Sequence, residues 1–66
     1  MLRDDFFLYE WRCLANGSCL FTRRRLTASG RPGKTKKEVL VPAAAMEGEA
    51  PEDVLRDVVD EGGFDY

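Results

Sequence analysis

The stretch FFLYEWRCLANG at residues 6–17 decides the fold. In residues 6–14 the side chains follow a period of two, which predicts a strand with an apolar face made of Phe7, Tyr9, Trp11 and Cys13. Asn16-Gly17 comes next. An Asn-Gly pair between two β-prone runs predicts a hairpin closed by a two-residue type I′ turn.

A two-residue turn at Asn16-Gly17 also sets the register of the hairpin. On the apolar face it pairs Phe7 with Leu26, Trp11 with Thr22 and Cys13 with Leu20. It also predicts an ion pair between Glu10 and Arg23 and a cation–π contact between Tyr9 and Arg24. A shift of one residue would turn Arg23 and Arg25 toward the aromatic face, so we predict the register without that shift.

The rest of the chain predicts a loop, a third strand and a helix. Residues 28–34 are rich in Gly, Pro and Ser and predict a loop, and residues 36–41 predict a strand that Pro42 ends. Residues 43–50 predict a connector that begins with a helical turn. Residues 51–61 predict a helix with Pro at its first position, Gly62-Gly63 at its end and Phe64 packed back on it. The predicted buried stripe of this helix is Val54, Leu55, Val58 and Val59.

This order of elements predicts an α+β fold. We expect a small three-stranded antiparallel sheet, with one C-terminal helix packed on its aromatic face. The 66 residues are expected to form a single domain, 1–66, because a chain of this length leaves little room for a second. No apolar run approaches the ~20 residues of a membrane-spanning helix. No membrane association is therefore expected. Asp4 and Asp5 stand where a signal peptide would carry only bases, so we expect a cytoplasmic protein.

Charge is divided unequally along the chain. Residues 1–42 hold nine Lys or Arg and four Asp or Glu, whereas residues 43–66 hold one Arg and eight acids. Residues 23–37 alone carry seven bases and no acid. Such a division predicts two surfaces of opposite sign and bears on partners rather than on the fold.

The two cysteines, Cys13 and Cys19, are expected to be free thiols. In the predicted register their sulfurs point to opposite faces of the hairpin and cannot bond. The chain has no His, so two cysteines cannot complete a four-ligand zinc site. Free thiols are consistent with the reducing compartment of a cytoplasmic protein.

The sequence predicts no enzyme activity and no catalytic, cofactor or metal site. Its Ser and Thr residues have no evident base. Residues 33–35 read Gly-Lys-Thr, as at the end of a phosphate-binding loop, but that motif requires Gly where Ala28 stands. A turn-forming loop is the simpler interpretation.

A small chain with two charged surfaces and no catalytic motif indicates a non-catalytic interaction protein. We expect it to bind a larger protein partner and to modulate or inhibit it, as small regulators carried by phages and mobile elements do. The predicted partner-binding residues are Arg23, Arg25, Arg31, Lys34 and Lys36 on the basic side and Asp57 and Glu61 on the acidic side. The alternative is a nucleic-acid-binding domain that uses the basic hairpin 23–37. An inactive accessory subunit of an enzyme and a homodimer held by the opposite charges are further hypotheses.

Overall fold

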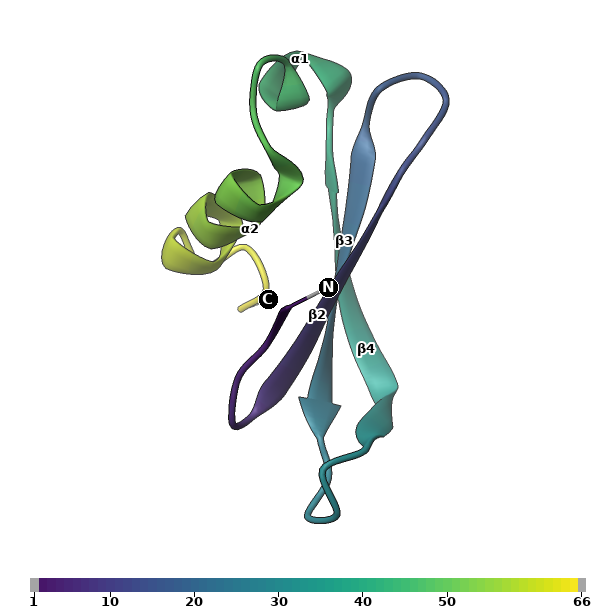
Figure 1. Cartoon of the computed structure of the whole chain (residues 1–66), viewed down its shortest axis with the longest axis vertical. Helices are drawn as coiled ribbons and strands as arrows, with labels where there is room; N and C mark the ends of the chain where they lie inside the picture. The colour runs from purple at the N-terminus through teal and green to yellow at the C-terminus, as the bar shows by residue number, and fades with distance from the viewer. Residues whose placement is uncertain (1, 66) are drawn as a thin grey trace.

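A computed structural model describes residues 2–65 and shows a four-stranded antiparallel sheet with two helices on one side (Figure 1). The strands are β1 (Leu2–Arg3), β2 (Phe7–Cys13), β3 (Cys19–Leu26) and β4 (Pro32–Val41), and they lie in the sheet in chain order. The helices are α1 (Ala43–Met46) and α2 (Pro51–Asp60). The α+β class and the antiparallel hairpin are confirmed, but the sheet has four strands rather than three.

The turn between β2 and β3 differs from the predicted two-residue turn. Leu14 N–H donates to Ser18 O (2.7 Å) and Gly17 N–H donates to Leu14 O (3.0 Å), so the loop has three residues. Gly17 has a φ of 90°, whereas Asn16, like every other non-glycine residue in 2–65, does not have positive φ. A type I′ turn requires positive φ at both central residues, which only Gly17 supplies. Asn16 Oδ1 instead accepts hydrogen bonds from the N–H and hydroxyl of Ser18.

The extra loop residue shifts the register by one, and the predicted pairs are wrong. Phe7 lies opposite Arg25, Tyr9 opposite Arg23, and Trp11 opposite Phe21. Arg23 and Arg25 are therefore on the aromatic face, the arrangement that the predicted register was chosen to avoid. This face accommodates the Arg23 guanidinium through the aromatic rings of Phe7 and Phe64.

The same shift places Cys13 directly opposite Cys19, with their Cα atoms 4.0 Å apart. The two residues form a disulfide, and the prediction of free thiols is wrong. Two sulfurs on one face of a closely spaced cross-strand pair are within bonding reach, which the predicted register did not allow.

The edges of the sheet are unequal. The short strand β1 was not predicted, and it pairs Leu2 with Tyr9 and Arg3 with Leu8. Asp4 makes the turn into β2, because its Oδ1 accepts hydrogen bonds from the N–H groups of Phe6 and Phe7, each at 2.7 Å. At the other edge, β4 begins four residues earlier than the predicted strand and is irregular opposite the stretch between Arg24 and Leu26.

Helix α2 begins at Pro51 as predicted and ends at Asp60, one residue early. Gly63 N–H donates to Val58 O (2.9 Å) and Gly62 N–H to Val59 O (3.1 Å), which is the Schellman pattern. Gly62 supplies the left-handed conformation that this pattern requires, with φ of 73°. The chain then turns so that Phe64 is buried, as predicted.

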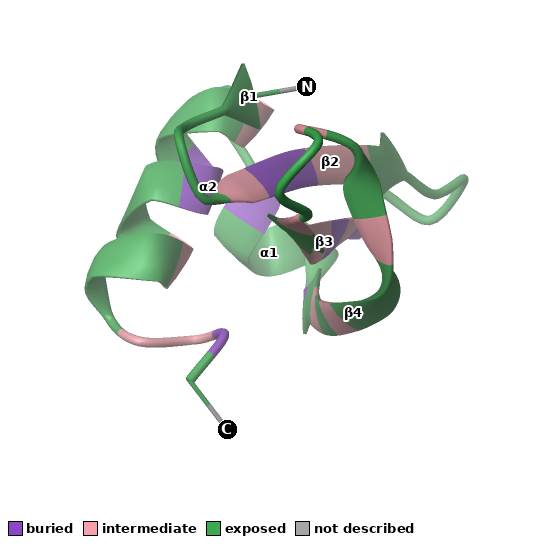
Figure 2. Ribbon diagram, turned by 90° about the horizontal axis from the view of Figure 1, so that it is seen from below, coloured by how far each residue is buried: buried purple, intermediate pink, exposed green. Residues whose placement is uncertain are grey.

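The core lies between the helices and the sheet (Figure 2). Its buried residues are Tyr9, Cys19, Phe21, Val41, Met46, Val54, Leu55 and Phe64. Val58 packs against this cluster, but Val59, predicted to be buried, is 38% exposed. No helix within residues 2–65 is long and apolar enough to span a membrane.

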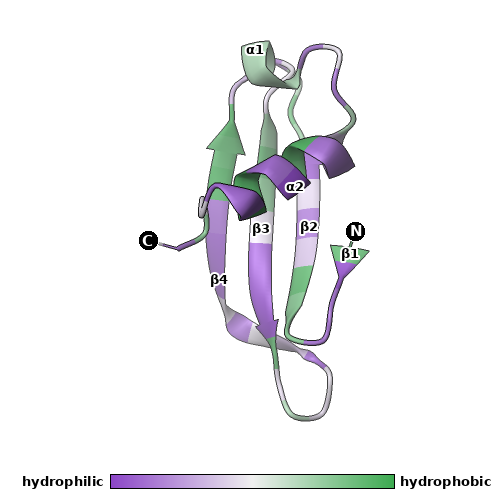
Figure 3. Ribbon diagram, turned by 90° about the vertical axis from the view of Figure 1, so that its left-hand side faces the viewer, coloured by the Kyte–Doolittle hydropathy of each residue, from purple (hydrophilic) through white to green (hydrophobic). Residues whose placement is uncertain are grey.

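Helix α2 lies across the middle of the sheet, and the lower ends of β3 and β4 extend beyond it (Figure 3). That uncovered end is where most basic residues of the chain are found, and it is the position of the candidate site.

Candidate interaction surface

Four predicted partner-binding residues are exposed near the loop that joins β3 to β4. We call this set the basic end: Arg25, Arg31, Lys34 and Lys36. Arg25 belongs to β3, Lys34 and Lys36 belong to β4, and Arg31 lies in the loop between them. None of the four forms an ion pair with a carboxylate of residues 2–65. Their positive charge is therefore not neutralised within the described chain.

Arg23, the fifth predicted basic contact, is engaged internally. Its guanidinium carbon lies 4.3 Å from the centre of the Phe7 ring and 5.5 Å from that of Phe64, both cation–π distances. Its Nη2 donates to Phe64 O (3.2 Å), and its Nη1 is 3.7 Å from Asp65 Oδ1. Arg23 therefore anchors the C-terminal segment to the sheet, and little of its side chain faces solvent.

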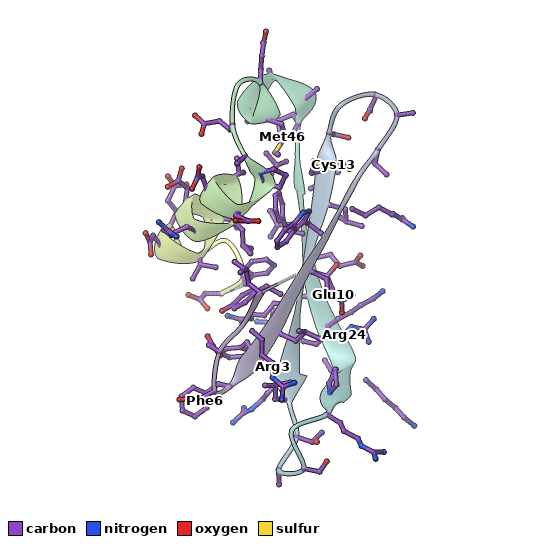
Figure 4. All side chains as sticks on the ribbon, in the orientation of Figure 1. Arg3, Phe6, Glu10, Cys13, Arg24 and Met46 are labelled. Carbon is purple, nitrogen blue, oxygen red and sulfur yellow. A yellow bond between two sulfur atoms is a disulfide. The ribbon has the colours of Figure 1, made fainter. Side chains whose placement is uncertain are left out.

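Glu10 pairs with Arg24 rather than with Arg23 as predicted. These two side chains lie on the face of the sheet away from α2 (Figure 4), with Arg24 Nε 3.6 Å from Glu10 Oε1. Arg24 Nε is buried and has no hydrogen-bond partner within residues 2–65. Of the three consecutive arginines, Arg23 and Arg24 lie beside carboxylates of the chain, and only Arg25 has no carboxylate partner within residues 2–65.

A cavity of about 300 Å³ opens beside the basic end. It is lined by Phe7, Arg23, Arg25, Thr35, Lys36 and Lys37. Two of the lining cations, Arg25 and Lys36, have no carboxylate partner within residues 2–65, so the cavity is complementary to an anionic group. The predicted register differs from the observed one by one residue and turns Phe7 and Arg25 to opposite faces of the sheet. The sequence therefore did not predict that the two residues share this cavity.

The acidic candidates lie elsewhere on the molecule. Asp57 and Glu61 are exposed at α2 and its C-terminal end, and they border a cavity of about 290 Å³ with Val41 and Val58. They line no described cavity together with the basic end. The two predicted groups therefore form separate surfaces.

A third cavity, of about 310 Å³, lies between β1 and α2 and was missed because β1 was not predicted. Its lining includes Leu2, Tyr9, Leu55 and Val59. Only Asp4, a residue type that commonly starts turns, could have indicated this edge.

Tyr9 in this cavity provides a pH-dependent prediction. Burial raises the pKa of the Tyr9 phenol above 10.0, Asp4 raises it further, and Arg23 opposes both. The fold therefore favours the neutral phenol, and this stabilisation is complete below about pH 10 and is lost as the pH rises through the folded-state pKa. We expect the stability of the wild-type protein to fall more than that of Tyr9→Phe between about pH 8 and about pH 11. Urea titrations of both proteins measure this difference, and parallel losses would contradict it.

Comparisons with family models, with curated proteins and with solved structures find no match, so the description of this surface rests on its own geometry.

Proposed function

We propose that this protein is a non-catalytic interaction protein that binds a larger protein and modulates or inhibits it. The basic end is the proposed contact surface, and the complementary surface of the partner is acidic. The supporting observation is that Arg25, Arg31, Lys34 and Lys36 are exposed and have no carboxylate partner within residues 2–65. Such charges attract an acidic surface over distance and accelerate association at low salt.

Asp57 and Glu61 are the proposed contacts of a second, acidic surface. They line no described cavity together with the basic end, so we propose them as a separate contact. The basic end holds four of the seven predicted partner-binding residues, so it is the one that we test first.

The test begins with capture of the partner from source cells and continues with purified components. Association rates are measured for the wild-type protein, for Arg25→Ala/Lys36→Ala, and for the control Arg12→Ala/Arg56→Ala. Both variants remove two exposed cations, but only the first removes them from the basic end. We expect the first to slow association about tenfold at low salt and the control to change it little. Equal rates for all three proteins would overturn the proposal.

Binding of nucleic acid is the second candidate function, favoured by the cluster of cations around the cavity beside Phe7. It predicts an affinity for oligonucleotides that falls linearly with salt on a log–log plot. The net charge of −2 and sequence pI of about 5.0 argue against it, because dedicated nucleic-acid-binding domains are basic. Absence of binding to single- or double-stranded oligonucleotides at low salt would exclude this candidate.

The cytoplasm remains the predicted location. The disulfide bears on this prediction, because a reducing cytoplasm opposes such bonds. Trapping of thiols by rapid alkylation in source cells would show whether Cys13 and Cys19 are reduced there.

A further inference from the structure

Strand β4 is a long edge of the sheet. It has ten residues and pairs only with β3 among residues 2–65, whereas the opposite edge strand β1 has two. An edge strand presents unpaired N–H and C=O groups to which another extended chain can bond. The outward-facing backbone groups and the charges of β4 therefore determine which chain can pair with it.

Backbone hydrogen bonds in the hairpin show which residues of β4 face outward. Leu14 N–H donates to Ser18 O and Leu26 N–H donates to Phe6 O, so the even-numbered residues of β3 are turned toward β2. In an antiparallel ladder the direction alternates, so the odd-numbered residues of β3 are turned toward β4. The odd-numbered residues of β4 that lie opposite them therefore bond inward, and the backbone groups of Lys36 and Leu40 face outward.

No backbone hydrogen bond of a turn, loop or cap in residues 2–65 reaches Lys36 or Leu40. The side chains of both residues are exposed, and Leu40 is 59% exposed although it is aliphatic. The outer edge of β4 is thus accessible at both of these positions.

The charge of this edge favours pairing with an acidic strand. Strand β4 carries Lys34, Lys36 and Lys37 against one acid, Glu38. Lys36 borders cavities of about 300 and 230 Å³, and Arg25 borders the larger of these two. A second copy of β4 would bring the same positive surplus, whereas an acidic strand would be attracted to the part of β4 that holds Lys34, Lys36 and Lys37.

We propose that the partner supplies an acidic, extended segment that pairs with the outer edge of β4 as a fifth strand. One of its carboxylates then lies over the cavity between Arg25 and Lys36. This inference rests on the proposed function and specifies its mode, in which the main chain provides hydrogen bonds and alternate side chains provide charge recognition.

The test uses a fluorescein-labelled peptide of alternating Glu and Val residues and, as a control, its Lys–Val counterpart. Affinities are measured by anisotropy at low salt for the wild-type protein, Lys36→Ala and Lys36→Pro. Both variants remove the same charge, but only proline removes the outward N–H, and proline is tolerated at sheet edges. We expect the alanine variant to bind the acidic peptide a few-fold more weakly than wild type, and the proline variant to lose roughly a further three- to tenfold.

Amide hydrogen exchange of the wild-type protein provides a readout that does not depend on the folding of the proline variant. We expect the acidic peptide to slow exchange at Lys36 and Leu40, and to leave exchange at Arg56, in the middle of α2, unchanged.

Three results would overturn this inference, and the first of them separates it from the proposed function. Equal affinities of the two variants together with unchanged exchange at β4 would overturn strand pairing, yet leave the proposed function intact if the basic-end variant still slows association with the captured partner. Protection of these amides in the protein alone, with a dimeric mass by light scattering, would assign the edge to a second copy and overturn the inference. Tighter binding of a single-stranded oligonucleotide than of the acidic peptide would overturn it as well.

Discussion

The substitution Phe21→Ala is expected to lower the free energy of unfolding by about 3–5 kcal/mol. Phe21 is 0% exposed, lies in β3 and packs against Trp11 with ring centres 6.4 Å apart. Removing a buried Phe side chain costs about 3–5 kcal/mol, because apolar contacts are lost and a cavity remains. A 66-residue domain is expected to have roughly 3–10 kcal/mol of stability in total. The substitution therefore removes a large part of the free energy that holds the fold.

Leu40→Ala is the matched control for this prediction. Leu40 lies on the neighbouring strand β4, but its side chain is 59% exposed. We expect the urea midpoint of Leu40→Ala to stay close to that of the wild-type protein, while the midpoint of Phe21→Ala falls to a much lower urea concentration. Similar midpoints for Phe21→Ala and wild type would show that the core does not lie between β3 and the helices.

The elements that could be predicted from sequence are those that long apolar periodicity defines. Residues 6–14 alternate with a period of two, and residues 51–61 carry a helical stripe between Pro51 and Gly62. Both patterns repeat over several residues, so a single misleading position does not change the result. Strand β2 and helix α2 accordingly lie within a residue or so of their predicted limits.

The register could not be predicted because it depends on one backbone conformation. Asn16-Gly17 is compatible with a two-residue turn and with a three-residue loop in which only Gly17 has positive φ. Charge pairing between Glu10 and Arg23 favoured the two-residue turn. The three-residue loop places Arg23 beside aromatic rings, which carries a desolvation cost. The structure offsets that cost through Phe7, Phe64 and Asp65, and residues 64 and 65 are far from Arg23 in sequence.

Errors in the candidate site follow from the register. Arg25, Arg31, Lys34 and Lys36 are exposed, but the sequence did not show that Arg23 and Arg24 are engaged with other residues. It also did not show the cavity at Phe7 or the disulfide, both of which require the observed strand pairing. Strand β1 escaped prediction because two residues are too few to form a pattern.

Reduction of the Cys13–Cys19 disulfide is expected to lower the free energy of unfolding by about 2 kcal/mol. The bond joins cysteines six residues apart, so it restricts a short loop of the unfolded chain and contributes less than a bond that closes a long loop. In a domain of this size that loss corresponds to a fall of roughly 8–16 °C in the melting temperature. Melting curves with and without dithiothreitol measure the effect, and thiol titration confirms reduction.

The double variant Cys13→Ala/Cys19→Ala is the control for reagent effects, since its melting temperature should not respond to dithiothreitol. Cys19 is buried in the core whereas Cys13 is exposed, so the variant also loses packing at Cys19 and is compared only with itself. An unchanged melting temperature of the wild-type protein after full reduction would mean that the hairpin is already ordered by its loop and by β4. In that case the fold would be equally stable in a reducing compartment, and the disulfide would carry no argument against a cytoplasmic location.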